Sequence, residues 1–431
     1  MDIQEIANLC KKAAISMSAI STQAKNNALE RIITALKENA SKIFAANNKD
    51  LEQAQKDNLE PPLLKRLKFD ETKLVEACDG IKSLIQLEDP VGKTLSALEL
   101  DTGLELYKVS RPIGVIGVIF ESRPDALVQI AALCLKSGNA VLLKGGSEAS
   151  ATNQILAAII LQAGVESGCP EGWLGLLETR SDVSQMLQLD HAIDLIIPRG
   201  SNEFVKYIMD NTNIPVLGHA DGICHVYIDK SADLKMAIDI AIDSKCQYVA
   251  VCNAAETILV HQAVADTLLP DLKQALEAQG VKIVGCSRTR SIIDVAPATQ
   301  KDWKTEYLDL IVSVRVVQTL DDGLAHINQY GSGHTDVIVS KDKERALYFM
   351  DHADTADAFW NCSSRFADGF RFGLGAEVGI STNKIHARGP VGLEGLMIYQ
   401  WRMLGNGHQV KDYVGKNAKP FTHKPITKIF S

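Results

Sequence analysis

Strand-like and helix-like segments alternate through most of this chain, and this alternation limits its fold more than any other feature. The apolar run GVIGVIF (114–120) is followed by a helical pattern at 124–136 and then by the buried strand AVLL (140–143). The helix begins at Pro124 and ends at a Ser-Gly-Asn turn. Similar strand–helix pairs continue to about residue 352. The pattern predicts an α/β protein with doubly wound sheets.

The chain of 431 residues is long enough for two or three domains. We predict a cofactor-binding domain over 1–246, with a helical N-terminal part and a flap strand near 100–112. A catalytic domain would follow over 247–396, and an extended tail, 397–431, would pair in the flap or with another subunit. IPVLG (214–218) is predicted to be a further strand. These boundaries place Cys252 at a junction of two domains, where ligand clefts are common.

Composition excludes several functional classes. The net charge is −8 and no block of five or more basic residues occurs, so nucleic acid and anionic membranes are poor partners. The nine cysteines have irregular spacing and form no CxxC motif, which argues against a structural zinc site or a disulfide framework. No apolar run approaches the ~20 residues that span a bilayer, and the N-terminus does not read as a signal peptide. We therefore expect a cytoplasmic protein with reduced thiols and no metal.

Cys252 is the strongest candidate for a catalytic residue. It follows an apolar run and precedes Asn253 and the strand-like segment ETILVHQ (256–262), which would present the thiol at a turn. A thiolate suits nucleophilic attack on a carbonyl carbon. Most cysteines are buried and inert, so the remaining motifs must decide between the two interpretations.

Two short segments could bind the phosphates of a nucleotide. The chain contains no GxGxxG motif, but LLKGGSE (142–148) and IPRGSNE (197–203) each combine a strand end, small residues and a helix start. Both could also be ordinary strand-to-helix turns. The candidate cofactor residues are Lys144, Gly145, Gly146, Ser147, Arg199, Gly200 and Ser201.

The glycine-rich stretch 361–396 contains Arg365, Arg371, His386 and Arg388. We favour an anionic ligand for it, because arginine forks match carboxylate and phosphate; the alternative is a connection with solvated arginines. In ESRPD (121–125), Ser122 and Arg123 could face the same cleft as Cys252, or the segment could only cap a helix. His334 lies in the small-residue loop GSGHTD, where a lone histidine is more often structural.

These segments, in this order, resemble the aldehyde dehydrogenase superfamily. The resemblance is carried by RPIGVIGVIFESRP, SGNAVLLKGGSE, PVLGHADGICHVYID, TEYLDLIVSVRVV and YGSGHTD. VCNAAET, SSRFADG, FGLGAEVGIST and HARGPVGLEGL are similar to the branch that reduces glutamyl phosphate in proline biosynthesis. The resemblance implies an aldehyde dehydrogenase-like fold: two doubly wound α/β domains with a small β-flap oligomerisation element.

The resemblance also implies roles for individual residues. Cys252 would be the nucleophile, Lys144 would meet the adenosine ribose of NADP(H), and Glu306 would hold the nicotinamide ribose. The turn Arg199, Gly200, Ser201 would lie near the pyrophosphate. Candidates for holding the substrate carboxylate and phosphate are Arg123, Arg365, His386 and Arg388.

Two positions depart from ordinary aldehyde dehydrogenases. Val216 precedes Leu217 and Gly218 where those enzymes carry the glutamate that activates water. Ser122 stands where they carry an oxyanion-hole asparagine, so we expect the Cys252 N–H to act with Ser122 or Asn253. The missing glutamate favours a thioester that is discharged by hydride and not by water.

The expected reaction is attack of Cys252 on L-glutamate 5-phosphate, loss of phosphate and reduction by NADPH to L-glutamate 5-semialdehyde. The expected assembly is a homo-oligomer, a dimer or a tetramer, with a possible contact to glutamate 5-kinase. The alternatives are a hydrolytic aldehyde dehydrogenase, a nucleotide-binding regulatory protein without catalysis and a thiol acyltransferase without cofactor.

Overall fold

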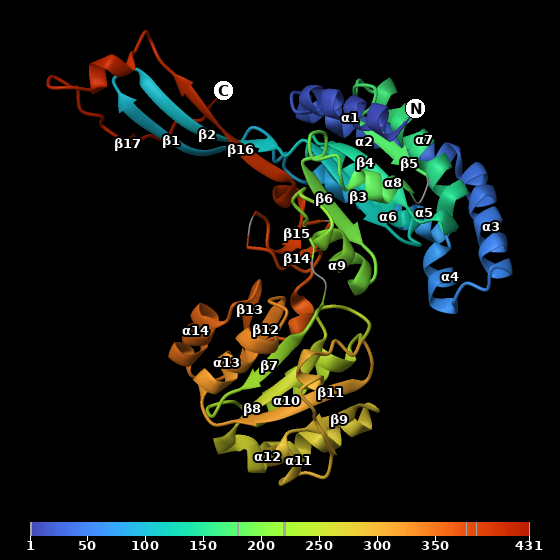
Figure 1. Cartoon of the computed structure of the whole chain (residues 1–431), viewed down its shortest axis with the longest axis vertical. Helices are drawn as coiled ribbons and strands as arrows, with labels where there is room; N and C mark the ends of the chain where they lie inside the picture. The colour runs from blue at the N-terminus through green and yellow to red at the C-terminus, as the bar shows by residue number, and fades with distance from the viewer. Residues whose placement is uncertain (1, 179–180, 219–220, 376, 385, 431) are drawn as a thin grey trace. The chain divides into compact units, whose positions relative to one another are not determined.

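The computed structural model of the chain describes residues 2–178, 181–218, 221–375, 377–384 and 386–430. It divides into two compact units, each described by itself below (Figure 1). Unit 1 comprises Met1–Gly200, Ile208–Val216 and Gly392–Ser431, and unit 2 comprises Ser201–Tyr207 and Leu217–Val391. The predicted boundary at residue 246 differs from this division, because the strand and helix at 224–246 are part of the sheet layer of unit 2.

Unit 1 is built on a parallel sheet of order β5-β4-β3-β6. All residues of β3 and β4 are buried, which explains why these segments read as continuous apolar runs. The strands are β3 (Val115–Phe120), β4 (Ala140–Gly145), β5 (Leu174–Leu177) and β6 (Leu195–Arg199).

Helices surround this sheet in two tiers. α1, α6 and α7 pack on its strands, α2 and α3 pack on α7, and α5 packs on α6. The helices are α1 (Ile3–Met17), α2 (Thr22–Glu38), α3 (Ala40–Lys56), α4 (Pro61–Leu67), α5 (Glu71–Gln86), α6 (Pro124–Lys136), α7 (Ser150–Glu166) and α8 (Ser181–Met186). α9 (Asn202–Asp210) contributes its first residues to unit 2 and its last residues to unit 1.

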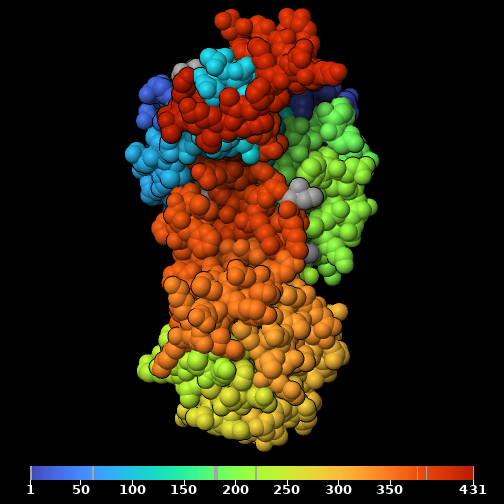
Figure 2. All heavy atoms as spheres, turned by 90° about the vertical axis from the view of Figure 1, so that its left-hand side faces the viewer, coloured from blue at the N-terminus to red at the C-terminus, as the bar shows by residue number. Residues whose placement is uncertain are grey.

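A separate antiparallel sheet of order β16-β2-β1-β17 joins the C-terminal tail to the alternating segment near residue 100. β16 pairs with β2 along its whole length, from Met397 opposite Pro112 to Leu404 opposite Glu105. In Figure 2 the red tail lies against the cyan strands β1 and β2. The strands are β1 (Thr94–Asp101), β2 (Leu104–Pro112), β16 (Met397–Leu404) and β17 (Lys424–Pro425).

Unit 2 is built on a larger parallel sheet of order β10-β9-β11-β8-β7-β12-β13. Its strands are β7 (Cys224–Ile228), β8 (Ala255–His261), β9 (Lys282–Gly285), β10 (Ala296–Pro297), β11 (Ile311–Val317), β12 (Thr335–Val339) and β13 (Asp357–Trp360). A small pair, β14 (Gly379–Ser381) and β15 (Gly389–Val391), lies outside it.

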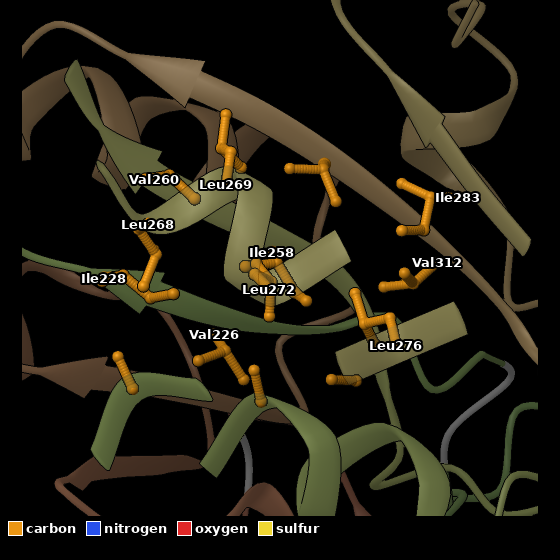
Figure 3. Close-up of a cluster of buried hydrophobic side chains, with 14 of the residues drawn as sticks. Val226, Ile228, Ile258, Val260, Leu268, Leu269, Leu272, Leu276, Ile283 and Val312 are labelled. Atoms are coloured by element: carbon orange, nitrogen blue, oxygen red, sulfur yellow. The ribbon is translucent and has the colours of Figure 1, made fainter. Parts of the chain in front are cut away.

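Alternate side chains of the buried strands contact helices on opposite faces of this sheet. Val226 and Ile258 pack with α10 and α11, as the close-up in Figure 3 shows for Leu268, Leu272 and their neighbours. Tyr227 and Leu259 pack with α13 and α14. The sheet is therefore doubly wound, with α10 (Leu234–Cys246), α11 (Gln262–Ala278), α12 (Ser287–Arg290), α13 (Leu320–Tyr330) and α14 (Lys343–His352).

The prediction of a strand over 214–218 is wrong. The segment makes one isolated bridge, between Val216 and Ile196, instead of a ladder. Pro215 has no N–H and therefore cannot donate to a neighbouring strand. Each of the nine cysteines is a free thiol, and none of the described helices has the length and apolar character needed to cross a bilayer.

Leu272 tests how far unit 2 depends on this packed face. Its side chain is 1% exposed among the residues of the core shown in Figure 3. Leu272→Ala should lower the free energy of unfolding by about 2–5 kcal/mol, measured by chemical denaturation, because it removes apolar contacts and leaves a cavity. Leu347→Ala on α14, where the leucine is 46% exposed, is the control and should change it by less than about 0.5 kcal/mol. Equal effects of the two substitutions would contradict this assignment of the core.

Candidate active site

Cys252 lies in the turn that leads into β8, and its side chain is half-buried. Neighbouring backbone fixes this turn closely. A Cβ added at Gly222 would come within 2.2 Å of the Cys252 carbonyl oxygen and 2.3 Å of its Cα, so only glycine fits there. The Cys224 thiol donates to the same carbonyl oxygen at 3.2 Å. The segment before and at the start of β7 therefore holds the backbone of the candidate nucleophile.

His334 contacts the thiol directly, with 3.2 Å between its Nε2 and the Cys252 Sγ. The imidazole is fully buried, and its other nitrogen, Nδ1, lies 2.7 Å from the Thr335 hydroxyl. Thr335 in turn donates to Asp357 Oδ2 at 3.4 Å. Because the hydroxyl proton goes to Asp357, the hydroxyl oxygen is left to accept from Nδ1–H, and Nε2 presents a lone pair to the thiol.

Asp357 completes this row from the neighbouring strand, since Thr335 and Asp357 are register partners of β12 and β13. Burial raises the pKa of the Asp357 carboxyl to about 6, although Thr335 and Arg388 favour its charged form. At neutral pH the carboxyl is therefore mostly ionised and able to accept the threonine proton.

His334 was assigned no role from the sequence, but a signal for one was present. The histidine precedes β12 as Cys252 precedes β8, and both strands are neighbours of β7 in a parallel sheet. Residues before parallel strands meet at the same edge of the sheet. The order of the strands, which the sequence did not reveal, was needed to use that signal.

The two side chains predicted to complete an oxyanion hole are engaged elsewhere. Asn253 is buried, and its Nδ2 donates to the Ala367 carbonyl oxygen at 2.7 Å. In unit 1, the backbone N–H and the hydroxyl of Ser122 both donate to Glu148 Oε1, at 2.6 and 2.7 Å. Ser122 adopts a left-handed backbone with φ 45°. Each side chain thus fixes a loop, and neither role as an oxyanion donor goes beyond a prediction.

Arg365 is the predicted substrate residue most closely associated with Cys252. Its loop is tied to the nucleophile turn, because the Ser364 hydroxyl donates to the Asn253 carbonyl oxygen at 2.6 Å. The guanidinium is mostly buried and donates from Nε to Gln247 Oε1 at 2.9 Å. Within the described ranges it forms no ion pair. Burial and the neighbouring Arg371 lower its pKa, while Cys252 is among the groups that favour its charge.

The other predicted substrate residues have different surroundings. Arg388 is half-buried and pairs with Asp354, with 3.2 Å between Nη2 and Oδ1. His386 is exposed with a left-handed backbone, φ 65°. Arg123 lies in unit 1, exposed at the N-cap of α6. Arg365 is therefore the strongest candidate for an anionic ligand beside the thiol.

In unit 1 the predicted phosphate-binding residues lie at or just after the carboxyl ends of β4 and β6, the edge where parallel sheets usually bind ligands. Lys144 is buried at the end of β4, and its ammonium donates to the Gly145 carbonyl oxygen at 2.5 Å. Gly146 and Ser147 then open towards solvent, as does Gly200 after β6.

A groove of about 400 Å³ lies between β5 and α7, the helix that begins soon after the turn at Gly146 and Ser147. Most of its lining residues are apolar, and the two polar ones are Gln154 and Glu178. A flat, partly apolar ring with polar edges, such as adenine, suits such walls. The groove residues were not recognised from the sequence, because their pattern is that of an ordinary helix and strand. The lining consists of Gln154, Ala157, Ala158, Leu161, Leu174, Leu176 and Glu178.

Glu306 lies in unit 2, half-buried in the loop before β11. Its Oε2 accepts a hydrogen bond from Asn202 Nδ2 at 2.5 Å, and Asn202 also donates to Asp221 at 3.1 Å. Ser201 directly precedes Asn202, and its hydroxyl accepts from the Phe204 N–H at 3.4 Å, as an N-cap does. Two segments predicted to bind the cofactor, at Ser201 and Glu306, are thereby linked within one unit.

Comparison with known proteins agrees with this geometry. The sequence profile described as the aldehyde dehydrogenase family matches residues 1–284. A gamma-glutamyl phosphate reductase of Acetivibrio thermocellus is 62% identical over all of both chains. A second, of Pelotomaculum thermopropionicum, is 61% identical over 99% of this chain and 98% of its own.

A solved structure extends the similarity to the fold. The crystal structure of gamma-glutamyl phosphate reductase from Thermotoga maritima superposes with a TM-score of 0.93 at 39% identity, covering 95% of this chain and 100% of that one. The chain therefore belongs to the aldehyde dehydrogenase family, in which it groups with the gamma-glutamyl phosphate reductases.

Proposed function

We propose that this chain reduces L-glutamate 5-phosphate to L-glutamate 5-semialdehyde and phosphate with NADPH, as a step of L-proline biosynthesis. The observation that carries the proposal is the 3.2 Å contact between the Cys252 thiol and His334. A thiol with an adjacent base is the arrangement needed to form and release a thioester. The names of the relatives, gamma-glutamyl phosphate reductase, supply the substrate class.

His334 accounts for the proton in each half of the reaction. Nε2 accepts the proton of the Cys252 thiol as the sulfur attacks the acyl phosphate carbon and phosphate departs. It returns the proton to the sulfur when the reduced thiohemiacetal collapses to the aldehyde. The hydrogen bonds from Nδ1 to Thr335 and from Thr335 to Asp357 keep the ring in the orientation and tautomer that this exchange requires.

Residues predicted to bind NADP(H) occur in unit 1 and in unit 2, and the groups of each unit suit separate parts of the cofactor. The groove between α7 and β5 has the size and apolar walls to take an adenine, and the turn at Lys144–Ser147 would meet the adenosine ribose. The turn Arg199–Ser201 would meet the pyrophosphate and Glu306 the nicotinamide ribose. A bound reduced nicotinamide supplies the hydride for the thioester.

Val216 supports a reductase over a hydrolytic dehydrogenase. Its side chain cannot activate water, which would otherwise compete with hydride for the thioester. Arg365 supports an anionic substrate, because a mostly buried guanidinium that forms no ion pair in the described part of the chain favours a carboxylate or phosphate ligand.

We also infer that the chain acts as a homo-oligomer. β16 is an edge strand of the antiparallel sheet and carries half-exposed large apolar side chains at Tyr399, Trp401 and Met403. Exposed apolar edge strands are sites of association between chains. Analytical ultracentrifugation measures the assembly, and a monomer would contradict this inference.

The proposed reaction is tested in reverse, as NADP⁺ reduction by L-glutamate 5-semialdehyde. The reaction should require inorganic phosphate, because phosphate must discharge the Cys252 thioester. Cys252→Ala should reduce the rate by about three orders of magnitude or more. Cys286→Ser is the control, since Cys286 only caps the short helix α12 and serine can replace that cap. Rapid turnover without phosphate would indicate a hydrolytic dehydrogenase instead.

His334→Gln tests the base beside the thiol. Loss of the proton acceptor should lower kcat/KM by about 10²–10⁴-fold and slow alkylation of Cys252 by iodoacetamide at neutral pH. His352→Gln, which changes an exposed histidine stacked on Tyr348, should leave both rates unchanged. If His334→Gln had wild-type alkylation and turnover, the proposed role of His334 would be wrong.

Arg365→Lys and Arg388→Lys distinguish the two arginines. The lysine at 365 retains charge but loses the fork, so KM for phosphate in the reverse assay should rise about tenfold or more. The lysine at 388 can still pair with Asp354 and should have the smaller effect. The reverse order of the two effects would assign the ligand to Arg388.

A further inference from the structure

Unit 2 contains a completely buried ion pair that the reaction described above does not use. Lys245 Nζ, from the last turn of α10, lies 2.6 Å from Glu256 Oε2 on β8, and both side chains are 0% exposed. A buried pair costs desolvation of two charges and is a poor source of net stability. Two apolar residues at these positions would stabilise the fold equally well. The presence of two charged residues here therefore indicates a role other than stability.

The second oxygen of Glu256 provides that explanation. Glu256 Oε1 accepts a hydrogen bond from the Leu308 backbone N–H at 3.4 Å. Leu308 has a left-handed backbone, φ 53°, which a branched side chain rarely adopts without support. The carboxylate therefore holds the loop before β11 at its most strained residue.

Lys245 reaches the same loop from the other partner of the pair. Its ammonium lies 5.9 Å from the centre of the Tyr307 ring. The Tyr307 hydroxyl is fixed at its far end, 2.9 Å from both Asp302 Oδ1 and Ser313 Oγ. Lys245 thus lies near Tyr307, and Glu256 accepts a hydrogen bond from the next residue, Leu308. Glu306 directly precedes these two residues.

The charge of Glu306 also affects the pKa of Glu256. Burial raises the pKa of Glu256 to about 7, and the negative charge of Glu306 contributes to the rise while Lys245 opposes it. Two carboxylates close enough to interact would repel each other without a cation between or beneath them. Lys245 is the cation in contact with Glu256, and its charge offsets this repulsion.

We propose that the Lys245–Glu256 pair is a positioning element that holds the 305–309 loop so that Glu306 can bind the ribose of the nicotinamide cofactor. The inference rests on the proposed function, since it takes NADPH as the ligand. Glu256 lies near the start of β8, directly after the turn that carries Cys252, so the thiol and the support of the cofactor loop are close together along the chain.

The test measures NADPH binding directly, by titration of cofactor fluorescence, together with the rate of Cys252 alkylation by iodoacetamide. Glu256→Gln should raise the Kd for NADPH about tenfold while the alkylation rate stays within about twofold of wild type. Asp229→Asn is the control, because Asp229 is a buried carboxylate directly after β7 of the same sheet and pairs with the partly buried Arg345. It should leave the Kd unchanged.

Glu306→Gln, alone and combined with Glu256→Gln, decides whether the pair acts through Glu306. The double variant should bind NADPH no more weakly than Glu306→Gln alone, because the two substitutions remove one interaction. If Glu256→Gln fails to fold, the double variant Lys245→Met with Glu256→Met, which leaves no unpaired buried charge, is measured with the same expectations. An unchanged Kd, or fully additive effects, would overturn the inference, whereas a wild-type chain that binds no NADPH would overturn the proposed function itself.

Discussion

The chemistry proposed for this chain depends on one contact, between the thiol of Cys252 and the imidazole of His334. A cysteine alone at a turn is an ordinary half-buried residue, and a buried histidine alone is an ordinary core residue. At 3.2 Å from each other, they have the arrangement of a nucleophile and its base. The parallel pairing of β8 with β7 and of β7 with β12 makes this possible, because it places the residues before two of the strands at one edge.

Much of unit 2 maintains that contact. Gly222 allows the backbone before β7 to press against the nucleophile turn, and Cys224 donates to its carbonyl oxygen. Ser364 and Asn253 join the same turn to the loop that carries Arg365. These contacts restrict the conformation of the turn and so the position of the sulfur. A reacting group needs such preorganisation. Asn253, which was predicted to contact the substrate, here donates a hydrogen bond to the backbone of the neighbouring loop.

The two units use opposite edges of their sheets. In unit 1 the predicted cofactor residues lie at the carboxyl ends of strands, as Lys144 and Arg199 do, in keeping with the usual rule for parallel sheets. In unit 2 Cys252 and His334 precede their strands. The rule therefore agrees with the residues predicted for the cofactor in unit 1, whereas it does not apply to Cys252 and His334.

The sequence by itself determined the α/β alternation, because apolar runs and helical periodicity are local properties. It also made Cys252, Lys144 and the glycine-rich arginine segment candidates for the site by residue type and spacing. It also indicated the family, since its motifs occur in order along the chain. Only the tertiary structure decided that His334 contacts Cys252 and that, among the described residues, Arg388 forms an ion pair and Arg365 does not. It also decided that Lys245 and Glu256 form a buried pair and that Glu256 hydrogen-bonds to Leu308. These are contacts between residues far apart in the chain, and they depend on strand order and on burial, which no local pattern encodes.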